Sequence, residues 1–399
     1  MRPSSERLKR GPRHQATRRN DVKKTLLYLH DGRSVYDEFF IGFLKEHYDV
    51  HFASFSRAGV RRVSERTGVS VHHLPEMPLE LRVHDTVRGM ALTGFRTAVL
   101  GATVRSIRPD VLLACWATTY GFYVSASGAG PYGLMVWGSD VLVQPRYIPV
   151  RAFASRALRK AERVFLDSDV QRRAAIGLGC EPGRIVKFPW ADLGWLLKMK
   201  VEKDMVRSGL GIPHGCKLVV FDRRHDPIYD PTTLVRAAAI VVRAHPEAFF
   251  LIAGEGRLTG RLKDMASELG LGRNARFTGW VERPRLAEYV ASSDIYVSTS
   301  LSDGTSASLL EAMALGVPPV VTAIPGNLEW VLDGVNGLVF ERGDEKGLAS
   351  AVTRLLRDEV LRASLGERAR ATVAERADWR RSSLLFLQGL RDVEAARER

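Results

Sequence analysis

The feature that most constrains this sequence is a repeated alternation of short apolar runs with amphipathic stretches of helical length. Short apolar runs are typical of strands that are buried on both faces of a parallel sheet. We interpret as strands the runs 25–29, 50–53, 111–115, 133–136, 163–166, 217–221, 248–253, 275–278, 295–298, 319–322 and 337–340. The intervening helical patterns include 35–46, 87–105, 231–244, 260–269, 283–291, 307–315 and 345–357.

This alternation predicts βαβ units with right-handed crossovers. Because it occurs twice in 399 residues, we expect an α/β protein with two doubly wound, Rossmann-like parallel-sheet domains that face a central cleft. The expected divisions are a basic disordered tail (1–20), a first domain (21–190), a charged linker (191–214), a second domain (215–375) and a C-terminal helix (376–399) that could pack on either domain.

The net charge of +14 is placed unevenly along the chain. Residues 1–190 hold 30 Lys and Arg against 17 Asp and Glu, whereas the rest hold 29 against 28. A basic half indicates an anionic partner, although a basic surface kept for solubility stays open as the alternative. No recognised nucleic-acid module accompanies it, so we expect no nucleic-acid partner.

Two further features concern location. No apolar stretch approaches the ~18 residues of a membrane span, and the basic N-terminus lacks the apolar core of a secretory signal. Cys115, Cys180 and Cys216 are few and unclustered, which indicates neither a disulfide framework nor a zinc site. We therefore expect a cytoplasmic protein.

The sharpest motif begins Ser300-Leu-Ser-Asp-Gly-Thr-Ser, between a predicted strand and a helix that starts near residue 307. Loop amides and a helix N-terminus together favour binding of an anion. Asp303 lies in this loop and Glu311 about one turn into the helix, where their carboxylates could accept hydrogen bonds from sugar hydroxyls. From composition alone, a helix cap at Asp303 and a solvent-facing Glu311 are equally acceptable.

The segment resembles the GT4 type of retaining glycosyltransferases, in which an acidic residue, seven others and a Glu form the signature. Asp303 and Glu311 have that spacing, with Asp in the usual place of the first Glu, as in a subgroup reading Ser-Asp-Gly-Thr. Similar landmarks in the same order are Pro109-Asp-Val-Leu-Leu, Trp137-Gly-Ser-Asp, Ala253-Gly-Glu-Gly, Phe277-Thr-Gly-Trp, Gly316-Val-Pro and Pro325-Gly-Asn-Leu-Glu.

The resemblance implies a GT-B fold in which the second domain binds a UDP- or GDP-sugar donor and the first binds the acceptor. It implies transfer with retention of configuration, with no cofactor and no essential metal. In it Glu311 holds the ribose, and Asp303 acts on the transferred sugar. The donor-loop residues implied to hold sugar and phosphate are Gly304, Thr305, Ser306 and Ser308.

Two arginines follow the first strand of the second domain. The family supplies an Arg and, five residues later, a Lys, whose charges stabilise the departing nucleoside diphosphate. Arg224 fits the Arg by this count, and Tyr229 occupies the Lys position. Arg223 is the candidate for the second positive charge at the donor. The alternative is that both are surface arginines on a loop with no role in the site.

Further candidates are more loosely indicated. Trp137 takes the place of a family His and could stack on the acceptor, although a core tryptophan is as well supported. Asp140 is expected to line the cleft near the chemistry. Gly32 allows the backbone to approach the donor, and Arg33 could meet an acceptor phosphate. Trp280 is a candidate contact of the nucleobase.

One further motif is rejected, and two alternative functions remain at this point. Asp167-Ser-Asp169 has the form of a metal-binding pair in a different glycosyltransferase fold, but it ends the last strand of the first domain, so we assign no metal. A nucleotide-sugar epimerase would need acid–base residues beside Asp303. A non-catalytic sugar-nucleotide-binding subunit is kept open by Tyr229 and Trp137.

The acceptor is expected to be anionic or lipid-linked and to meet the first domain, with peripheral contact to the inner face of a membrane. The charge asymmetry of the chain motivates this expectation. The early basic residues that we expect to take part are Arg57, Arg61, Arg62 and Arg66.

Overall fold

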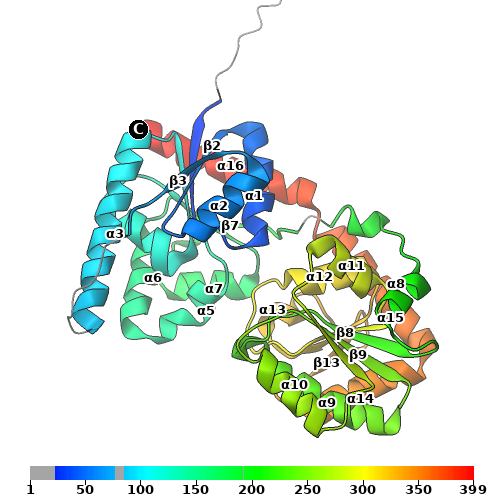
Figure 1. The fold of residues 1–399 in the computed structure, drawn as a ribbon. Coiled ribbons are helices and arrows are strands. Elements are labelled where there is room, and N and C mark those ends of the chain that lie inside the picture. The colour runs from blue at the N-terminus through cyan, green and yellow to red at the C-terminus, as the bar shows by residue number, and fades with distance from the viewer. Residues whose placement is uncertain (1–22, 77–84, 192) are drawn as a thin grey trace, which may run out of the picture.

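The computed structural model describes residues 23–76, 85–191 and 193–399, so the expected tail 1–20 lies almost wholly outside the described residues and nothing further is said of it. Figure 1 shows two α/β domains, each with helices on both faces of a central sheet. The described residues contain no helix that is both long and apolar enough to cross a bilayer.

The first domain is built on seven parallel strands in the order β3-β2-β1-β4-β5-β6-β7. Central β1 pairs with β2 and β4, and its residues are almost completely buried. The strands are β1 (Thr25–Leu29), β2 (Asp49–Ser54), β3 (Ser70–His73), β4 (Val111–Cys115), β5 (Gly133–Met135), β6 (Arg163–Leu166) and β7 (Ile185–Lys187). The two edge strands, β3 and β7, were not predicted because their side chains are only partly buried and carry no continuous apolar run.

The second domain has six parallel strands in the order β10-β9-β8-β11-β12-β13. All six were predicted to within one residue at each end. They are β8 (Lys217–Phe221), β9 (Ala248–Ala253), β10 (Ala275–Gly279), β11 (Ile295–Ser298), β12 (Pro319–Thr322) and β13 (Leu338–Phe340). Both sheets therefore confirm two doubly wound, Rossmann-like domains.

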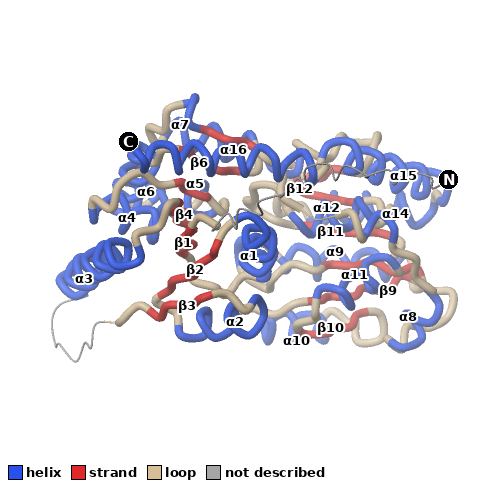
Figure 2. Tube along the Cα trace, turned by 90° about the horizontal axis from the view of Figure 1, so that it is seen from above, coloured by secondary structure: helices blue, strands red, loops and turns tan. Residues whose placement is uncertain are grey.

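The helices follow the strands as expected of βαβ units (Figure 2). Those of the first domain are α1 (Val35–His47), α2 (Arg57–Thr67), α3 (Asp85–Ile107), α4 (Gly121–Ser127), α5 (Ser139–Leu142), α6 (Ile148–Lys160) and α7 (Asp169–Gly177). Those that follow are α8 (Lys203–Gly209), α9 (Pro231–Ala244), α10 (Thr259–Glu268), α11 (Arg283–Ala291), α12 (Ala307–Ala314), α13 (Pro325–Leu328), α14 (Glu345–Arg357), α15 (Glu359–Arg376) and α16 (Trp379–Glu398). A π-helical turn, η1 (Trp116–Tyr120), and a short 3₁₀ turn, η2 (Gln144–Arg146), lie in the first domain.

The segment 191–214 differs from the expected linker. Part of its apolar side chains enter the core of the second domain. Most of its described charged side chains are exposed, although Arg207 pairs with Asp294 at 3.0 Å, so the segment is a surface layer of that domain. The buried residues that it contributes are Ala191, Leu193, Leu196, Val206, Leu210 and Ile212.

Helix α16 leaves the second domain directly after α15 and packs on the first domain (Figure 1). Phe386 stacks on Phe188 with ring centroids 5.0 Å apart, and Asp392 forms an ion pair with Arg163 at 2.8 Å. The chain thus crosses between the domains twice, and α16 closes the first domain's core.

Candidate functional site

The loop between β11 and α12 carries Asp303 and faces the first domain. Helix α12 begins after Ser306, whose hydroxyl accepts a hydrogen bond from the Leu309 amide at 3.4 Å. Ser306, not Asp303, is therefore the helix cap, which leaves the Asp303 carboxylate for another partner. The buried Leu309, Leu310 and Met313 fix the helix on the core of its domain.

Arg223 is that partner. It follows β8, is buried, and its Nη2 forms an ion pair with the Asp303 carboxylate. Its Nη1 donates to the hydroxyls of Ser306 at 2.8 Å and Ser308 at 3.2 Å. The Tyr229 ring lies 4.4 Å from the guanidinium carbon. Burial disfavours the charged guanidinium, but Asp303 outweighs it and raises the pKa of Arg223, so a fixed positive charge lies on the donor loop.

Arg224 points away from this loop, which corrects the expected position of its side chain. The side chain is 73% exposed, and it forms an ion pair with Asp226 at 3.0 Å. The amide of Asp226 also donates to the Arg224 carbonyl at 2.8 Å, which marks a tight turn after the strand. This turn directs Arg223 inward and Arg224 outward. The spacing of residues in the sequence does not show which of the two side chains faces the loop.

Glu311 on α12 pairs with Arg283 at the start of α11, at 2.8 Å. Burial raises the pKa of both Glu311 and Asp303, and the neighbouring arginines oppose that shift. Both signature carboxylates are thus partly buried beside a guanidinium and belong to one wall of the second domain. Trp280, just after β10, is 56% exposed, and its contact with a nucleobase stays a prediction.

The first domain holds the donor loop directly through the turn between β6 and α7. The Thr305 amide donates to the Asp167 carboxylate at 3.1 Å, and the Thr305 hydroxyl donates to the Asp167 carbonyl at 2.9 Å. A Cβ added at Gly304 would lie 2.4 Å from Nε2 of Gln171. Burial raises the pKa of Asp167 to about 7. We call this contact of Asp167 and Gln171 with Gly304 and Thr305 the interdomain clasp.

The interdomain clasp was missed in the sequence, where Asp167 was weighed only as a metal ligand. Its position at the carboxyl end of the last long strand was the available signal, because such ends line the cleft of doubly wound folds. Asp169 instead forms an ion pair with Lys187 at 2.6 Å. The two carboxylates of the Asp167-Ser-Asp169 motif therefore engage different partners.

A cavity of about 640 Å³ opens in the first domain at the carboxyl ends of its strands. Arg33 lines it but is paired with Asp31 at 2.9 Å. Arg96 lies 5.1 Å from the Phe55 ring, and its buried Nε has no hydrogen-bond partner among the described residues. The other lining residues include His30, Ser56, Arg57, Glu76, Trp116, Thr119, Tyr120 and Tyr123.

His30, which follows β1, also lines this cavity and was not among the residues singled out from the sequence. Its Nδ1 lies 2.6 Å from the Asp37 carboxylate, and its ring stacks on Trp137 with centroids 4.5 Å apart. Burial disfavours the charged imidazole, but Asp37 outweighs it and raises the pKa of His30. The cavity therefore combines cationic groups and the carboxylates of Asp31 and Glu76 with aromatic walls.

Two predicted residues, Trp137 and Asp140, shape the surroundings of this cavity. Trp137 packs between His30 and Trp190, as the core alternative predicted. Asp140 is fully buried and accepts from the amides of Ala117 at 2.8 Å and Trp137 at 3.0 Å, so it holds two loops instead of lining open space. Burial raises the pKa of Asp140 to about 6.

Gly32 has φ of 73°, and an added Cβ would lie 2.9 Å from the Gly59 backbone. Its requirement for glycine thus comes from close packing on α2, within the first domain, and its part in donor binding stays a prediction.

Two family models match the chain. One, described as "Glycosyl transferases group 1", matches residues 202–372, and the other, "Glycosyl transferase 4-like", matches residues 25–168. Together they cover β1 to β6 of the first sheet, the whole second sheet and the donor loop.

Curated relatives match about half of the chain. A D-inositol 3-phosphate glycosyltransferase of Thermomonospora curvata is 31% identical over 214 residues, 50% of this chain and 49% of the relative. A second such protein, of Catenulispora acidiphila, is 30% identical over 58% of each chain. The lipopolysaccharide core biosynthesis glycosyltransferase LpsE of Rhizobium meliloti is 29% identical over 46% of this chain and 55% of its own. The chain thus spans about half the length of the curated relatives it matches.

Solved structures match nearly the whole chain. HepE from Anabaena, in complex with UDP, superposes with a TM-score of 0.77 at 20% identity and covers 92% of this chain and 99% of that one. Sucrose-phosphate synthase from Thermosynechococcus elongatus gives a TM-score of 0.75 at 17% identity, over 94% and 100%. At these identities the likeness establishes a shared fold.

Proposed function

Because this chain belongs to the GT4-type glycosyltransferases and has their GT-B fold, we propose that it transfers a sugar from a UDP- or GDP-sugar to an acceptor hydroxyl with retention of configuration. The observation that carries the proposal is the wall formed by Arg223, Asp303, Ser306, Ser308 and Glu311. It combines a fixed cation, hydroxyls and two carboxylates, the groups that a nucleoside diphosphate sugar requires.

In this proposal the donor phosphates lie against Arg223 and the amides of the donor loop. Breaking the bond between the anomeric carbon and the phosphate oxygen leaves negative charge on the departing nucleoside diphosphate. A guanidinium already fixed in a water-poor site stabilises that charge more in the transition state than in the ground state. A protein cation in this place supports transfer without an essential metal ion.

The two carboxylates take separate parts. Glu311 lies deeper on α12 and holds the ribose, for which it exchanges part of its contact with Arg283. Asp303, at the loop, accepts hydrogen bonds from the transferred sugar. The interdomain clasp gives the first domain a part in positioning the donor loop, because it holds Gly304 and Thr305 against Asp167.

We further propose that the cavity of the first domain takes the acceptor and that this acceptor bears a phosphate or carboxylate, on a soluble or a lipid-linked molecule. Arg57 and Arg96 line the cavity with no carboxylate within salt-bridge distance among the described residues, and His30 is disposed to be charged. Two curated relatives carry D-inositol 3-phosphate, a phosphorylated polyol, in their names, which agrees with this chemistry.

A thermal-shift panel of nucleotide sugars tests the donor site. A donor at 100 times its dissociation constant adds about 2.7 kcal/mol to the stability of the folded protein. We expect a UDP- or GDP-sugar to raise the melting temperature of the wild type, and Glu311→Ala to lose most of that rise. If no nucleotide sugar shifts the wild type, the proposed donor site is wrong.

A further inference from the structure

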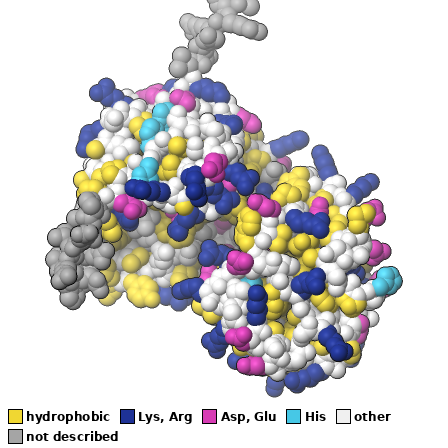
Figure 3. All heavy atoms as spheres, viewed as in Figure 1, with side chains coloured by type: hydrophobic (Ala, Val, Ile, Leu, Met, Phe, Trp, Pro, Cys, Tyr) yellow, Lys and Arg dark blue, Asp and Glu magenta, His cyan; other side chains and the backbone are white. Residues whose placement is uncertain are grey.

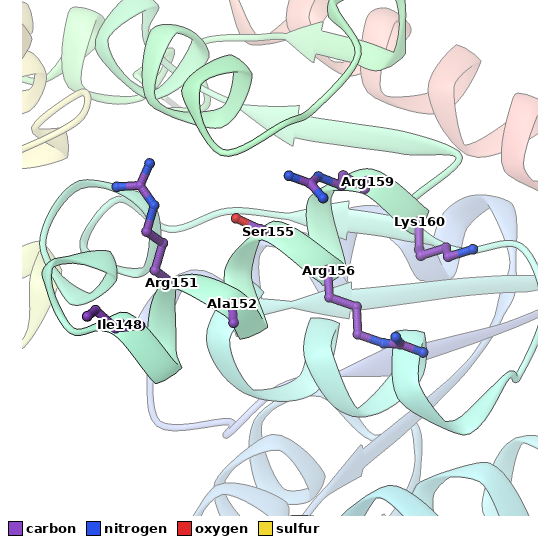
Figure 4. A pocket seen from close by; sticks show the side chains of 7 residues that line it. All are labelled: Ile148, Arg151, Ala152, Ser155, Arg156, Arg159 and Lys160. Carbon is purple, nitrogen blue, oxygen red and sulfur yellow. The ribbon is translucent and has the colours of Figure 1, made fainter.

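Helix α6 presents a basic face that the transfer reaction does not use. Ile148, Arg151, Ser155, Arg156, Arg159 and Lys160 line a shallow hollow of about 510 Å³ on it. Figure 4 shows the guanidinium groups of Arg151 and Arg159 on the same side of the helix, with Arg156 extending to the other side. We call Arg151, Arg159 and Lys160, with Tyr147 and Ile148, the α6 face, and we include Arg156, which flanks it from the other side of the helix.

The cations of the α6 face are unpaired. In the described part of the chain no carboxylate lies within 4.0 Å of any of the four, and the one side-chain hydrogen bond among them runs from Arg156 to the carbonyl of Ser125 at 3.2 Å. The arginines of α2 differ, because Arg62 pairs with Glu38 at 2.7 Å and Arg66 reaches Glu282 of the second domain at 3.4 Å.

Figure 3 shows Lys and Arg side chains gathered on the first domain where it borders the second, so part of the basic charge lies toward the cleft. The positive charge of α2 belongs to that border, since Arg57 lines the cavity and Arg66 bridges the domains. The α6 face keeps its charge free for a partner.

An apolar pair stands at the N-terminal end of the same helix. Ile148 is 83% exposed and Tyr147 is 71% exposed. The side of α6 that enters the core is formed instead by Ala154, Ala157 and Leu158. An exposed aliphatic and aromatic pair beside a row of cations matches a bilayer surface, where apolar side chains enter the headgroup region and cations meet anionic lipids. Nucleic acid would not require the apolar pair.

The α6 face also adjoins the proposed acceptor cavity. Gln144, three residues before Tyr147, accepts hydrogen bonds from the Trp116 indole at 3.2 Å and from the Thr118 hydroxyl. Trp116 lines the cavity. A surface bound by Tyr147 and Ile148 would therefore lie next to the cavity mouth.

We propose that the α6 face docks the protein on an anionic lipid bilayer, with Tyr147 and Ile148 in the headgroup region and the four cations on the lipid phosphates. The proposal does not depend on catalysis, since it concerns binding to vesicles. If the transfer function also holds, docking brings the cavity to membrane-borne acceptors.

Co-sedimentation with phosphatidylglycerol–phosphatidylcholine vesicles tests this proposal. We expect the full chain to bind at low salt, to release as salt rises, and to ignore pure phosphatidylcholine. Replacing Arg151, Arg156, Arg159 and Lys160 together by Gln should weaken binding by more than about 100-fold, at roughly fivefold for each cation near the surface. The double substitution Tyr147→Ser and Ile148→Ser should weaken vesicle binding most at high salt, because salt screens the attraction between charges but not the apolar contact with the lipid.

The matched control replaces Arg243, Arg261, Lys263 and Arg342, exposed cations of the second domain, by Gln and removes the same charge. Its affinity for vesicles should stay within about threefold of that of the wild type, because salt screens charges that lie far from the lipid surface. Equal loss in the control and the α6 variant would show attraction by net charge alone and overturn the proposal. So would a wild type that stays in solution, or one that binds short duplex DNA through the α6 face and vesicles not at all. Melting curves of all variants exclude misfolding as the cause.

Discussion

At the scale of single residues, Arg223 and Arg224 show that counting residues in a sequence does not tell which of two neighbouring side chains faces the site. Counting residues from Tyr229 favours Arg224, but the backbone turns tightly after β8 and buries Arg223 against Asp303. One residue separates a buried charge from a solvent-exposed one. The pair Asp303 and Glu311 could be singled out because seven residues separate two acidic ones in the pattern of the GT4 signature, whereas the cap at Ser306 became apparent only in the structure.

Replacing Arg223 by Ala is therefore expected to lower kcat by roughly 10²–10³, the usual loss when one fixed charge stabiliser is removed. Arg224→Ala, its neighbour, is the control and should stay within a few-fold of the wild type because its guanidinium points to Asp226. Steady-state kinetics with a saturating donor decide between them. A large loss in Arg224→Ala with a small one in Arg223→Ala would mean that the loop rearranges on binding the donor.

Glu311→Ala should act mainly on donor KM. A carboxylate that holds ribose hydroxyls contributes equally to the ground state and the transition state, so its loss raises KM and leaves kcat nearly unchanged. Initial rates over a range of donor concentrations measure both constants. An unchanged KM with a large fall in kcat would place Glu311 at the reacting sugar instead.

At the scale of elements, the strands in the interior of both sheets were predictable because each is buried on both faces and forms an unbroken apolar run. Edge strands β3 and β7 were not, since one side of each is open to solvent. The segment 191–214 was predicted to be a linker for a related reason. Its apolar residues alternate with charged ones, so the sequence shows no continuous apolar run, although several of these apolar side chains are buried in the core.

The approach of α13 to the donor loop yields a prediction about Gly326. A Cβ added there would lie 2.1 Å from the carbonyl oxygen of Gly304 and 2.6 Å from that of Asp303. Because backbone atoms cannot give way as a side chain does, Gly326→Ala should displace the donor loop and raise donor KM by about tenfold or more, a loss of roughly 1.4 kcal/mol or more in binding.

Gly260→Ala is the matched control, since an added Cβ on α10 meets nothing within 4 Å. It should be neutral or slightly stabilising, as expected for Gly to Ala in a helix. Donor titrations and melting curves of both variants provide the comparison. Full donor affinity in Gly326→Ala would show that the loop adapts and that its observed position is not required.

At the scale of the whole molecule, the two domains meet through the interdomain clasp, which involves a buried carboxylate. Sequence could not locate it, because Asp167 and Thr305 lie 138 residues apart and come together only when both sheets present their carboxyl ends to one cleft. The charge asymmetry was visible in the sequence, but its division between the cleft side of α2 and the α6 face was not.

The clasp predicts a pH dependence of stability. Burial raises the pKa of Asp167 from 3.8 to about 7, so the folded, closed protein binds a proton that the unfolded chain releases. Stability from this group is therefore full below pH 4 and is lost as pH rises toward 7, by up to about 4 kcal/mol at 1.36 kcal/mol for each pKa unit. Asp167→Asn should remove this slope.

Melting temperatures of the wild type and Asp167→Asn between pH 5 and pH 8 measure the difference. Asp169→Asn serves as the control, because the Lys187 partner lowers the pKa of Asp169 and no titration of that group falls in this range. Its curve should run parallel to the wild type. Parallel curves for Asp167→Asn as well would show that Asp167 does not titrate in the clasp.

The central claim, that the wall around Arg223 and Asp303 transfers sugar from a nucleotide sugar, is tested most directly by nucleotide release. UDP and GDP are measured in the presence of EDTA, with a panel of nucleotide sugars and matched phosphorylated and neutral polyol acceptors. We predict release by the wild type with a phosphorylated acceptor, and a fall of roughly 10²–10³ in Arg223→Ala. Tight donor binding without release on any acceptor, or release that Arg223→Ala leaves intact, would contradict the claim and favour a non-catalytic binding subunit.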